Sequence, residues 1–413
     1  MFSAPRCACS EISFLLLFLF AICLEAISER ALRVTDARHA NILAMTLSDS
    51  KMAETSLLER ARRLGHEVFA SLADDSGRLN RPLVRALGEQ GLLQLVFDGS
   101  ATELCELREG LAYRCTEAET ALALQGLGGH PILRAARPQI ADEWIPRLAG
   151  GSSVAAFALS EPEAGSDVAS LALRAEPDGD GYRLTGTKTW ISNAPDADVY
   201  SVFARTSDDG AKGITAFVVP RDSDGLSGEP IELVAPHPVG RLDFDGVRVE
   251  PVQVLGEVGG GFKVAMETLD LFRPSVGAFS VGMAQAALDA AVSHTAAREA
   301  FGRPLSDFQA VSHQLAEMAT RVQAARLLVR DAAGQYDAGV RPVRKASAMA
   351  KLYATEVAQQ AVDVAIQVHG AAALQKGHLL EHLYREVRAP RIYEGASEVQ
   401  REIIARELYK EAG

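Results

Sequence analysis

The residue best suited to acid–base chemistry lies near the C-terminus, in a short polar loop. Glu394 stands between Tyr393 and Gly395, shortly before a stretch with helical character. A carboxylate in such a loop acts as a general base when burial raises its pKa towards neutrality. The plain alternative is a solvated surface carboxylate that favours the dipole of the next helix. Ser397 and Gln400 form a capping-box pattern, which predicts that the last helix begins here.

Two segments in the middle of the chain combine turn formers with hydroxyl side chains. Leu159–Asp167 follows an apolar run and is rich in Pro, Gly, Ser and Asp, which is typical of a turn. The same composition suits a loop whose backbone and hydroxyls approach a cofactor. Thr187–Ala194 places a lone Trp beside Ser, a combination more often found in the core or on a sheet surface. Taken singly, each segment is weak evidence for a site.

One arginine lies where an apolar side chain is expected. Arg273 comes four residues after Leu269 and three before Val276, so it falls on the apolar stripe of a predicted helix. A buried charge is costly unless it is paired, whereas a long side chain at the edge of a stripe reaches solvent. Arg273 is therefore either a paired, buried charge or a residue that extends to the surface.

The chain changes character twice, which predicts an α+β multidomain fold in three parts. Residues 52–150 have apolar positions at helical spacing, residues 151–257 have short apolar runs between Gly- and Asp-rich turns, and residues 258–413 are helical again. We expect an N-terminal helical domain, a middle antiparallel β sandwich or barrel, and a C-terminal bundle of antiparallel helices. For a single site to form, these domains must bring together Leu159–Asp167, Thr187–Ala194 and the loop that carries Glu394.

The first 51 residues differ from the rest of the chain. The apolar run Ile12–Leu24 is too short to span a bilayer comfortably, and no clean cleavage site follows it. We interpret residues 1–51 as a leader or a mis-assigned start without ordered structure, with Met45 or Met52 as the preferred start. An export signal is the weaker alternative, and we expect no stable membrane span.

Composition limits the classes of partner and site. The formal net charge of -12 over 413 residues argues against a nucleic-acid partner. Three of the five cysteines lie in the first 23 residues, and the other two match no zinc pattern. This indicates a reducing compartment without disulfides or a metal site: the cytoplasm, or the mitochondrial matrix in a eukaryote. The chain has no glycine-rich Rossmann motif, P-loop, HExxH motif or GxSxG motif.

Several segments, taken together and in this order, resemble the acyl-CoA dehydrogenase family. The similarity runs from about Leu104 to Leu408. It rests on the loop Leu159–Asp167, the strand Trp190–Ser192, Arg298–Pro304 followed by Gln309, Gln367–Gly370, and the loop Ile392–Gly395. Several motifs in the correct order are far more specific than any one alone. The resemblance implies FAD bound without a Rossmann motif, and it narrows the C-terminal part to a four-helix bundle.

The resemblance also implies roles for residues around the cofactor. Ser160, Trp190 and Ser192 are expected to flank the isoalloxazine ring, and Ser166 to lie near the CoA arm. The other implied cofactor contacts are Arg298 and Gln309 at the pyrophosphate and adenosine end from the neighbouring subunit, Gln367 and Gly370 at the cofactor of the adjacent chain, and Phe301 and Gly395. An arginine suits a pyrophosphate because its planar fork of donors matches paired phosphate oxygens.

By the same resemblance, Glu394 abstracts the α proton of an acyl-CoA thioester while the β hydrogen leaves as hydride to flavin N5. The thioester carbonyl is expected to accept hydrogen bonds from the Glu394 main-chain N–H and a flavin ribityl hydroxyl, as in an oxyanion hole. Arg273 is expected near the catalytic carboxylate, which makes Glu394 its candidate partner. Some relatives carry their base one residue before this arginine, but here that residue is Phe272.

Three positions depart from the family pattern. Ala371 replaces a glycine, and Ala300 and Ala396 replace hydroxyl residues that often help to bind FAD. An acyl-CoA oxidase and a non-catalytic flavin-binding member of the same fold remain the alternative functions. The resemblance further implies a homodimer or homotetramer and an electron-transferring flavoprotein as acceptor. The length and shape of the acyl group, and the choice between CoA and carrier-protein thioesters, stay open.

Overall fold

The computed structural model describes residues 56 to 412. Helices fill the first part of this range. The interpretation of residues 1–51 lies outside the described residues. The helices are α3 (Leu57–Leu64), which continues into the π-helical turn η2 (Gly65–Phe69), then α4 (Arg81–Glu89), α5 (Leu92–Asp98), α6 (Ala101–Ala112), α7 (Thr116–Ala135) and α8 (Pro138–Ala149). The Ser100 and Glu103 side chains form a capping box that starts α6.

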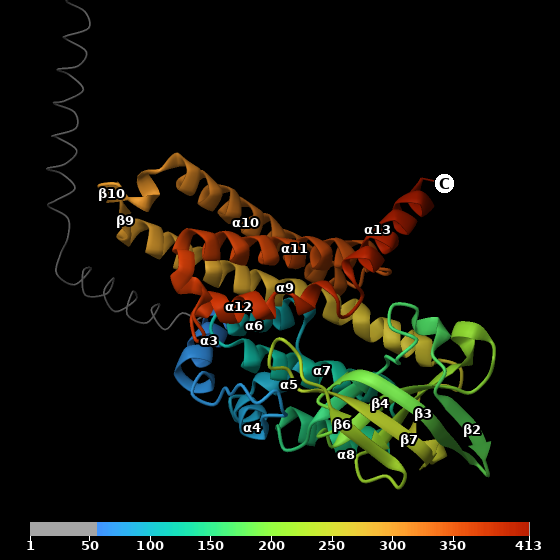
Figure 1. The fold of residues 1–413 in the computed structure, drawn as a ribbon. Helices are drawn as coiled ribbons and strands as arrows, with labels where there is room; N and C mark the ends of the chain where they lie inside the picture. The colour runs from blue at the N-terminus through green and yellow to red at the C-terminus, as the bar shows by residue number, and fades with distance from the viewer. Residues whose placement is uncertain (1–55, 413) are drawn as a thin grey trace, which may run out of the picture. The chain divides into compact units, whose positions relative to one another are not determined.

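The β region follows as one connected set of eight strands (Figure 1). The strands are β1 (Ala155–Ala158), β2 (Arg174–Asp178), β3 (Gly181–Ser192), β4 (Val199–Arg205), β5 (Ile214–Pro220), β6 (Leu226–Pro230), β7 (Val239–Val249) and β8 (Val254–Leu255). The order is β6-β7-β3-β2-β4-β5-β8, with β1 beside β4. Most neighbours are antiparallel, as predicted, whereas β1 and β2 each pair with β4 in parallel.

The sheet folds over so that its two halves face each other. Strands β2 and β4 are joined by the single pair Arg174↔Arg205, so the sheet bends at this point. Tyr182 of β3 and Phe217 of β5 then meet across the interior, with ring centroids 5.5 Å apart. Alternating side chains of both halves form this interior, which accounts for the sandwich-like pattern in the sequence.

Helix α7 lies directly against β1. A Cβ atom at Gly128 of α7 would be 2.6 Å from the main-chain nitrogen of Ala156, so only glycine allows this approach. Gln125 of the same helix donates to the carbonyls of Leu148 and Ser153 and accepts from the N–H of Ala155. The contact fixes the start of β1, the strand that leads into the Ser160 loop.

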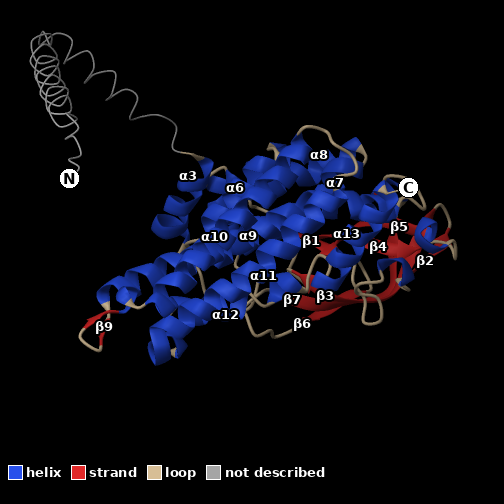
Figure 2. Ribbon diagram, turned by 90° about the horizontal axis from the view of Figure 1, so that it is seen from above, coloured by secondary structure: helices blue, strands red, loops and turns tan. Residues whose placement is uncertain are grey.

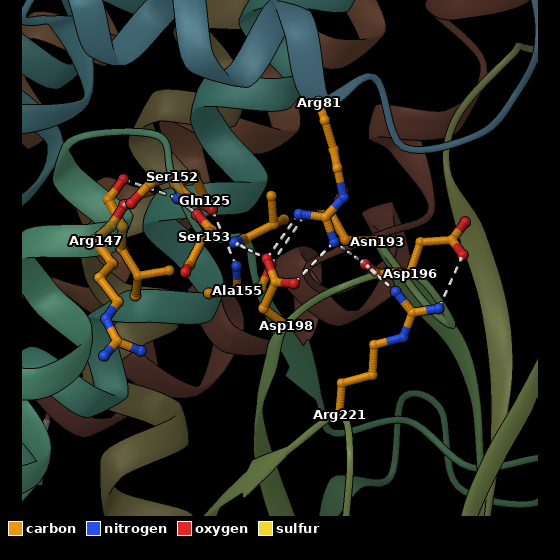
Figure 3. Close-up of polar contacts among 12 residues, drawn as sticks. Arg81, Gln125, Arg147, Ser152, Ser153, Ala155, Asn193, Asp196, Asp198 and Arg221 are labelled. Carbon is orange, nitrogen blue, oxygen red and sulfur yellow. Dashed lines mark hydrogen bonds and ion pairs between the residues drawn. The ribbon is translucent and has the colours of Figure 1, made fainter.

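A polar network joins the N-terminal helices to the β region at the start of β1 (Figure 3). The carboxylate of Asp198 accepts hydrogen bonds from Arg81 of α4, at 2.8 Å, and from the N–H of Val154, at 2.7 Å. Arg81 also donates to the main-chain oxygen of Asp196. One carboxylate therefore connects a helix of the first part to the residue just before the first strand of the second.

The last part is helical again, as Figure 2 shows in blue. Its elements are α9 (Gly261–Ala297), the short strands β9 (Glu299–Ala300) and β10 (Arg303–Pro304), and then α10 (Gln309–Asp337), α11 (Arg344–His369), α12 (Leu379–Glu386) and α13 (Ser397–Glu411). Helices α9, α10 and α11 pack against one another, α13 lies on α11, and α6 covers α9. The predicted order of helical region, β region and helical bundle is confirmed.

Helix α9 is apolar along most of its 37 residues. Among the described helices it alone is long and apolar enough to cross a membrane by length and composition, but 78% of its most apolar window is buried inside the protein. Burial on several sides by neighbouring helices explains the apolar composition, as expected for a helix at the centre of a bundle.

Candidate active site

The loop that carries Glu394 has an unusual backbone. Glu394 adopts φ 52° and Gly395 adopts φ 97°, both in the left-handed region. A Cβ atom at Gly395 would lie 2.5 Å from Nε2 of Gln400, so this position requires glycine for both conformation and space. A non-glycine residue with positive φ costs free energy and persists only where its surroundings hold it.

Three side chains from three helices hold this loop by its carbonyls. Arg273 of α9 donates from Nε to the main-chain oxygen of Glu394 at 3.1 Å. Lys351 of α11 donates from Nζ to the oxygen of Gly395 at 2.7 Å, and Gln400 of α13 donates to the same oxygen at 2.8 Å. The chain path at the base is therefore fixed from three directions.

The capping-box prediction for the last helix is wrong, although the helix begins where expected. Helix α13 starts at Ser397, but no side-chain hydrogen bond caps it at Ala396. Ser397 Oγ donates to Glu356 at 2.8 Å. The Gln400 amide instead donates to the carbonyls of Glu394 and Gly395, because the turn at Gly395 brings them within reach.

The Glu394 side chain is half-buried. Its Oε2 atom is buried and makes no hydrogen bond to any residue in the described part of the chain. Burial raises the pKa of Glu394 above the ordinary carboxyl value, while the positive charges of Arg108, Lys351 and Arg273 oppose that rise. A carboxylate with a raised pKa and a free oxygen is suited to accepting a proton.

Arg273 is buried, as its place on the apolar stripe allowed, with 7% of its surface exposed. Its carboxylate partner is Asp270, with Nη1 and Oδ1 3.3 Å apart. Toward Glu394 it binds the main-chain oxygen. Arg273 and Glu394 are thus neighbours, as predicted. However, Arg273 binds the backbone of Glu394 and forms its ion pair with Asp270.

Arg108 and Glu119 form a second buried ion pair, which the sequence interpretation missed. Arg108 of α6 donates to Glu119 of α7 and, at 2.6 Å, to the hydroxyl of Ser275. Burial raises the pKa of Glu119 to about 7, although Arg108 acts in the opposite direction. Arg108 lies next to Leu107 and near Leu111, so the argument used for Arg273 would have singled it out as a charge among apolar positions.

Trp190 lies on a distorted part of β3. It has φ 60° and is 58% exposed, and the pairing of β3 with β7 shifts register between Lys188 and Ile191. The N–H of Thr189 donates to the oxygen of Ser160 at 3.0 Å, so the predicted Ser160 and Trp190 segments lie side by side. Ser192, at the end of β3, is half-buried like Ser160, whereas Ser166 is exposed in the following loop.

A buried ion pair, also missed from the sequence, supports these two segments. Lys188 donates from Nζ to Glu161 at 2.7 Å and to the oxygen of Leu159 at 2.9 Å. Glu161 also accepts from the N–H groups of Ala172 and Leu173. One carboxylate thereby closes the loop that begins at Ser160 onto the start of β2.

The remaining predicted cofactor residues lie elsewhere. Figure 1 shows the β9–β10 hairpin at the end of the bundle away from the sheet. Phe301, at φ 52°, is 96% exposed there. Stacked rings of His294 and His369, with centroids 4.1 Å apart, bring the ends of α9 and α11 together. The exposed predicted residues at this end are Arg298, Phe301, Gln309, Gln367 and Gly370. The fold of one chain does not bring them to Glu394.

Known proteins share both the sequence and this architecture. Profiles of the acyl-CoA dehydrogenase middle and C-terminal domains match residues 156–247 and 259–409. Cyclohexane-1-carbonyl-CoA dehydrogenase of Geobacter metallireducens is 35% identical over 369 residues, which cover 87% of this chain and 97% of that protein. Butyryl-CoA dehydrogenase of Megasphaera elsdenii superposes with a TM-score of 0.81 at 30% identity, covering 86% of this chain and 98% of that chain.

A solved FAD complex of PigA is similar to the same extent. It superposes with a TM-score of 0.81 at 28% identity and covers 86% of this chain and 96% of that chain. The predictions of the family, of an oxidoreductase and of FAD as the cofactor of that family are therefore confirmed. On the extent of these matches, the chain belongs to the acyl-CoA dehydrogenase family.

Proposed function

We propose that this protein removes the α and β hydrogens of an acyl-CoA thioester and that Glu394 is the base for the α proton. The observation that carries the proposal is the state of the Glu394 carboxylate. It combines a pKa raised by burial, a buried Oε2 without a hydrogen-bond partner among the described residues, and a loop fixed by side chains of α9, α11 and α13. A surface carboxylate has none of these properties.

The residues near β3 fit FAD. Trp190 is 58% exposed although most neighbouring positions in β3 are half-buried or buried, and the half-buried Ser160 lies beside it. We propose that Ser160, Trp190 and Ser192 hold the flavin ring and that Ser166 contacts the CoA arm. When bound, FAD supplies the two-electron acceptor for the hydrogen that leaves the β carbon.

The protein's own groups then have separate tasks. Glu394 accepts the α proton at its carboxylate, and its main-chain N–H is proposed to polarise the thioester carbonyl. Arg273 keeps this N–H in place through the Glu394 carbonyl. Because the site is partly buried, these polar groups act with less screening by water. The proton must leave Glu394 before the next turnover.

The exposed set at the bundle end supports an oligomer. The β9–β10 hairpin lies away from β3 of the same chain (Figure 1). We therefore propose that Arg298, Phe301 and Gln309, in and beside this hairpin, contact FAD of a neighbouring subunit, together with Gln367 and Gly370. Named relatives act on cyclic and short linear acyl-CoA thioesters, and they come from bacteria, which favours the cytoplasm. An electron-transferring flavoprotein is the proposed acceptor.

The test is Glu394→Gln, measured on the FAD-loaded enzyme with a panel of acyl-CoA thioesters and an artificial electron acceptor. We expect an unchanged flavin spectrum and a loss of at least about 100-fold in kcat. Glu402→Gln, which removes an exposed carboxylate of α13 that pairs with Arg406, should keep full activity. Full activity of Glu394→Gln would contradict the proposal, and oxygen consumption in the same assay would identify an oxidase.

A further inference from the structure

Lys351 is a buried cation beside the loop that carries Glu394. Its side chain lies in α11 and is 0% exposed. Its one hydrogen bond found among the described residues goes from Nζ to the oxygen of Gly395, at 2.7 Å. A buried ammonium without a carboxylate contact is costly. The sequence interpretation assigned no role to this residue.

The three cations that act on Glu394 differ in how their charges are balanced. Arg108 is ion-paired with Glu119, and Arg273 is ion-paired with Asp270. No ion pair to a carboxylate is found for Lys351 within residues 56–412. Its charge is therefore the least neutralised of the three, and the carbonyl that it binds belongs to Gly395, the residue after Glu394.

The surroundings of Lys351 are consistent with this picture. Burial lowers its pKa to about 8, and the negative charges of Glu394, Glu356 and Glu398 act against that decrease. Arg273 adds to the decrease through repulsion. The other groups that interact electrostatically with Glu394 are Tyr393 and Arg108, which is paired with Glu119. Lys351 still carries a proton over most of the neutral range.

We propose that Lys351 is a positioning residue for Glu394: its ammonium holds the Gly395 carbonyl, and its unpaired charge keeps the neighbouring carboxylate ionised. The inference rests on the proposed role of Glu394 as base. It adds a division of tasks, because Gln400 binds the same carbonyl at 2.8 Å without carrying a charge. Both residues hold the carbonyl, but of the two only Lys351 adds a charge to the field that Arg108 and Arg273 also exert on Glu394.

That division makes the inference testable with two variants at one carbonyl. Lys351→Met removes the donor and the charge, whereas Gln400→Leu removes a donor of the same oxygen and leaves the charge. Both should lower kcat by about tenfold, because the base is held less firmly. In Lys351→Met alone, the acid limb of kcat/KM against pH should move up by about one pH unit, because the carboxylate loses a neighbouring cation.

Lys345→Met is the matched control. It removes a lysine of the same helix whose partner is the surface carboxylate of Glu411, so neither kcat nor the acid limb should change. Amide hydrogen exchange over residues 393–396 gives a readout independent of turnover. It should be faster in Lys351→Met and in Gln400→Leu than in the wild type, and unchanged in Lys345→Met.

An unshifted acid limb in folded Lys351→Met would overturn the inference while Glu394→Gln stays inactive, so the two proposals fail separately. If Lys351→Met does not fold, Lys351→Gln keeps a neutral donor in the same place. It should then retain slow exchange in the loop and still show the upward shift. Lys351→Gln with the wild-type acid limb would overturn the proposal in the same way.

Discussion

Two fully buried lysines in different parts of the molecule each donate a hydrogen bond to a loop carbonyl. Lys188 of β3 binds the oxygen of Leu159 at 2.9 Å, beside the Ser160 loop, and Lys351 of α11 binds the oxygen of Gly395 at 2.7 Å. Burial lowers the pKa of each to about 8. The difference is that Lys188 also has a carboxylate within reach, Glu161 at 2.7 Å.

This difference separates a structural charge from a functional one. The Lys188–Glu161 pair is internally neutral, so it fastens the loop at the proposed flavin side with little outward field. Lys351 fastens the loop at the proposed base and leaves its charge to act on Glu394. Buried ion pairs are weak evidence for net stability, but removing one member is costly. Substitution of Lys188 should therefore mainly lower stability, whereas substitution of Lys351 should also change the ionisation of Glu394.

The largest effect on stability is expected for Lys188→Met. It leaves Glu161 buried without its cation, and we expect a loss of about 3–5 kcal/mol in the free energy of unfolding. Urea unfolding monitored by circular dichroism measures this loss. The double variant Lys188→Met/Glu161→Gln should recover part of it, because no unpaired charge remains. A loss below about 1 kcal/mol in the single variant would mean that the pair is not the main support of the loop.

The second prediction concerns the pH dependence of stability at Lys351. Its pKa lies near 8 in the folded protein and at the ordinary value of 10.5 in the unfolded chain. Between these values the unfolded chain binds the extra proton, so the stability of the wild type rises with pH across this window. Lys351→Met lacks this contribution. The difference in unfolding free energy between the two proteins should therefore change by up to about 3 kcal/mol from pH 8 to pH 10.5, in favour of the wild type.

A third prediction concerns the strained turn that both Lys351 and Gln400 hold. Gly395→Ala places a methyl group 2.5 Å from the Gln400 amide and imposes φ 97° on a side-chain residue. We expect a loss of about 2 kcal/mol in stability and a large loss of kcat. Gly339→Ala is the control, because Gly339 also has a positive φ of 75° but has open space around it. Equal stability loss in both variants would leave backbone strain as the sole cause.

The sequence predicts the architecture better than the site, and the reason is physical. Apolar spacing marks long helices such as α9 because burial repeats with the helical period. Arg273 was found because it interrupts a stripe of large apolar residues. Lys351 interrupts a stripe of alanines, between Ala350 and Ala354, where the contrast is weak. The same argument applies there, but only packing shows that the position is fully buried.

Long-range geometry accounts for the errors. The parallel pairing of β1 with β4 joins residues far apart in the chain, such as Ala155 and Val199, which no local pattern encodes. The capping-box pattern fails because both of its side chains have other partners: Ser397 Oγ donates to Glu356 of α11, which is distant in sequence, and the Gln400 amide donates to the Gly395 carbonyl. Local rules predict elements, whereas the site depends on donors that α9 and α11 bring to the loop from distant parts of the sequence.

The smallest effect on the isolated chain is expected at the far end of the bundle. Phe301 is 96% exposed on the β9–β10 hairpin, and its ring meets only that of Phe308, at 6.2 Å between centroids, among the aromatic contacts found for described residues. Phe301→Ser should change the unfolding free energy by less than about 0.5 kcal/mol. If the hairpin contacts FAD of a neighbouring subunit, the same variant should release FAD several-fold more readily on dilution, as followed by flavin fluorescence.

Val234→Ser, at an apolar position that is 79% exposed in the β region, should release FAD like the wild type. If Phe301→Ser released FAD at the wild-type rate, the exposed hairpin would not be a contact for FAD. The residues that bind cofactor and substrate would then be confined to the Glu394 and Trp190 regions.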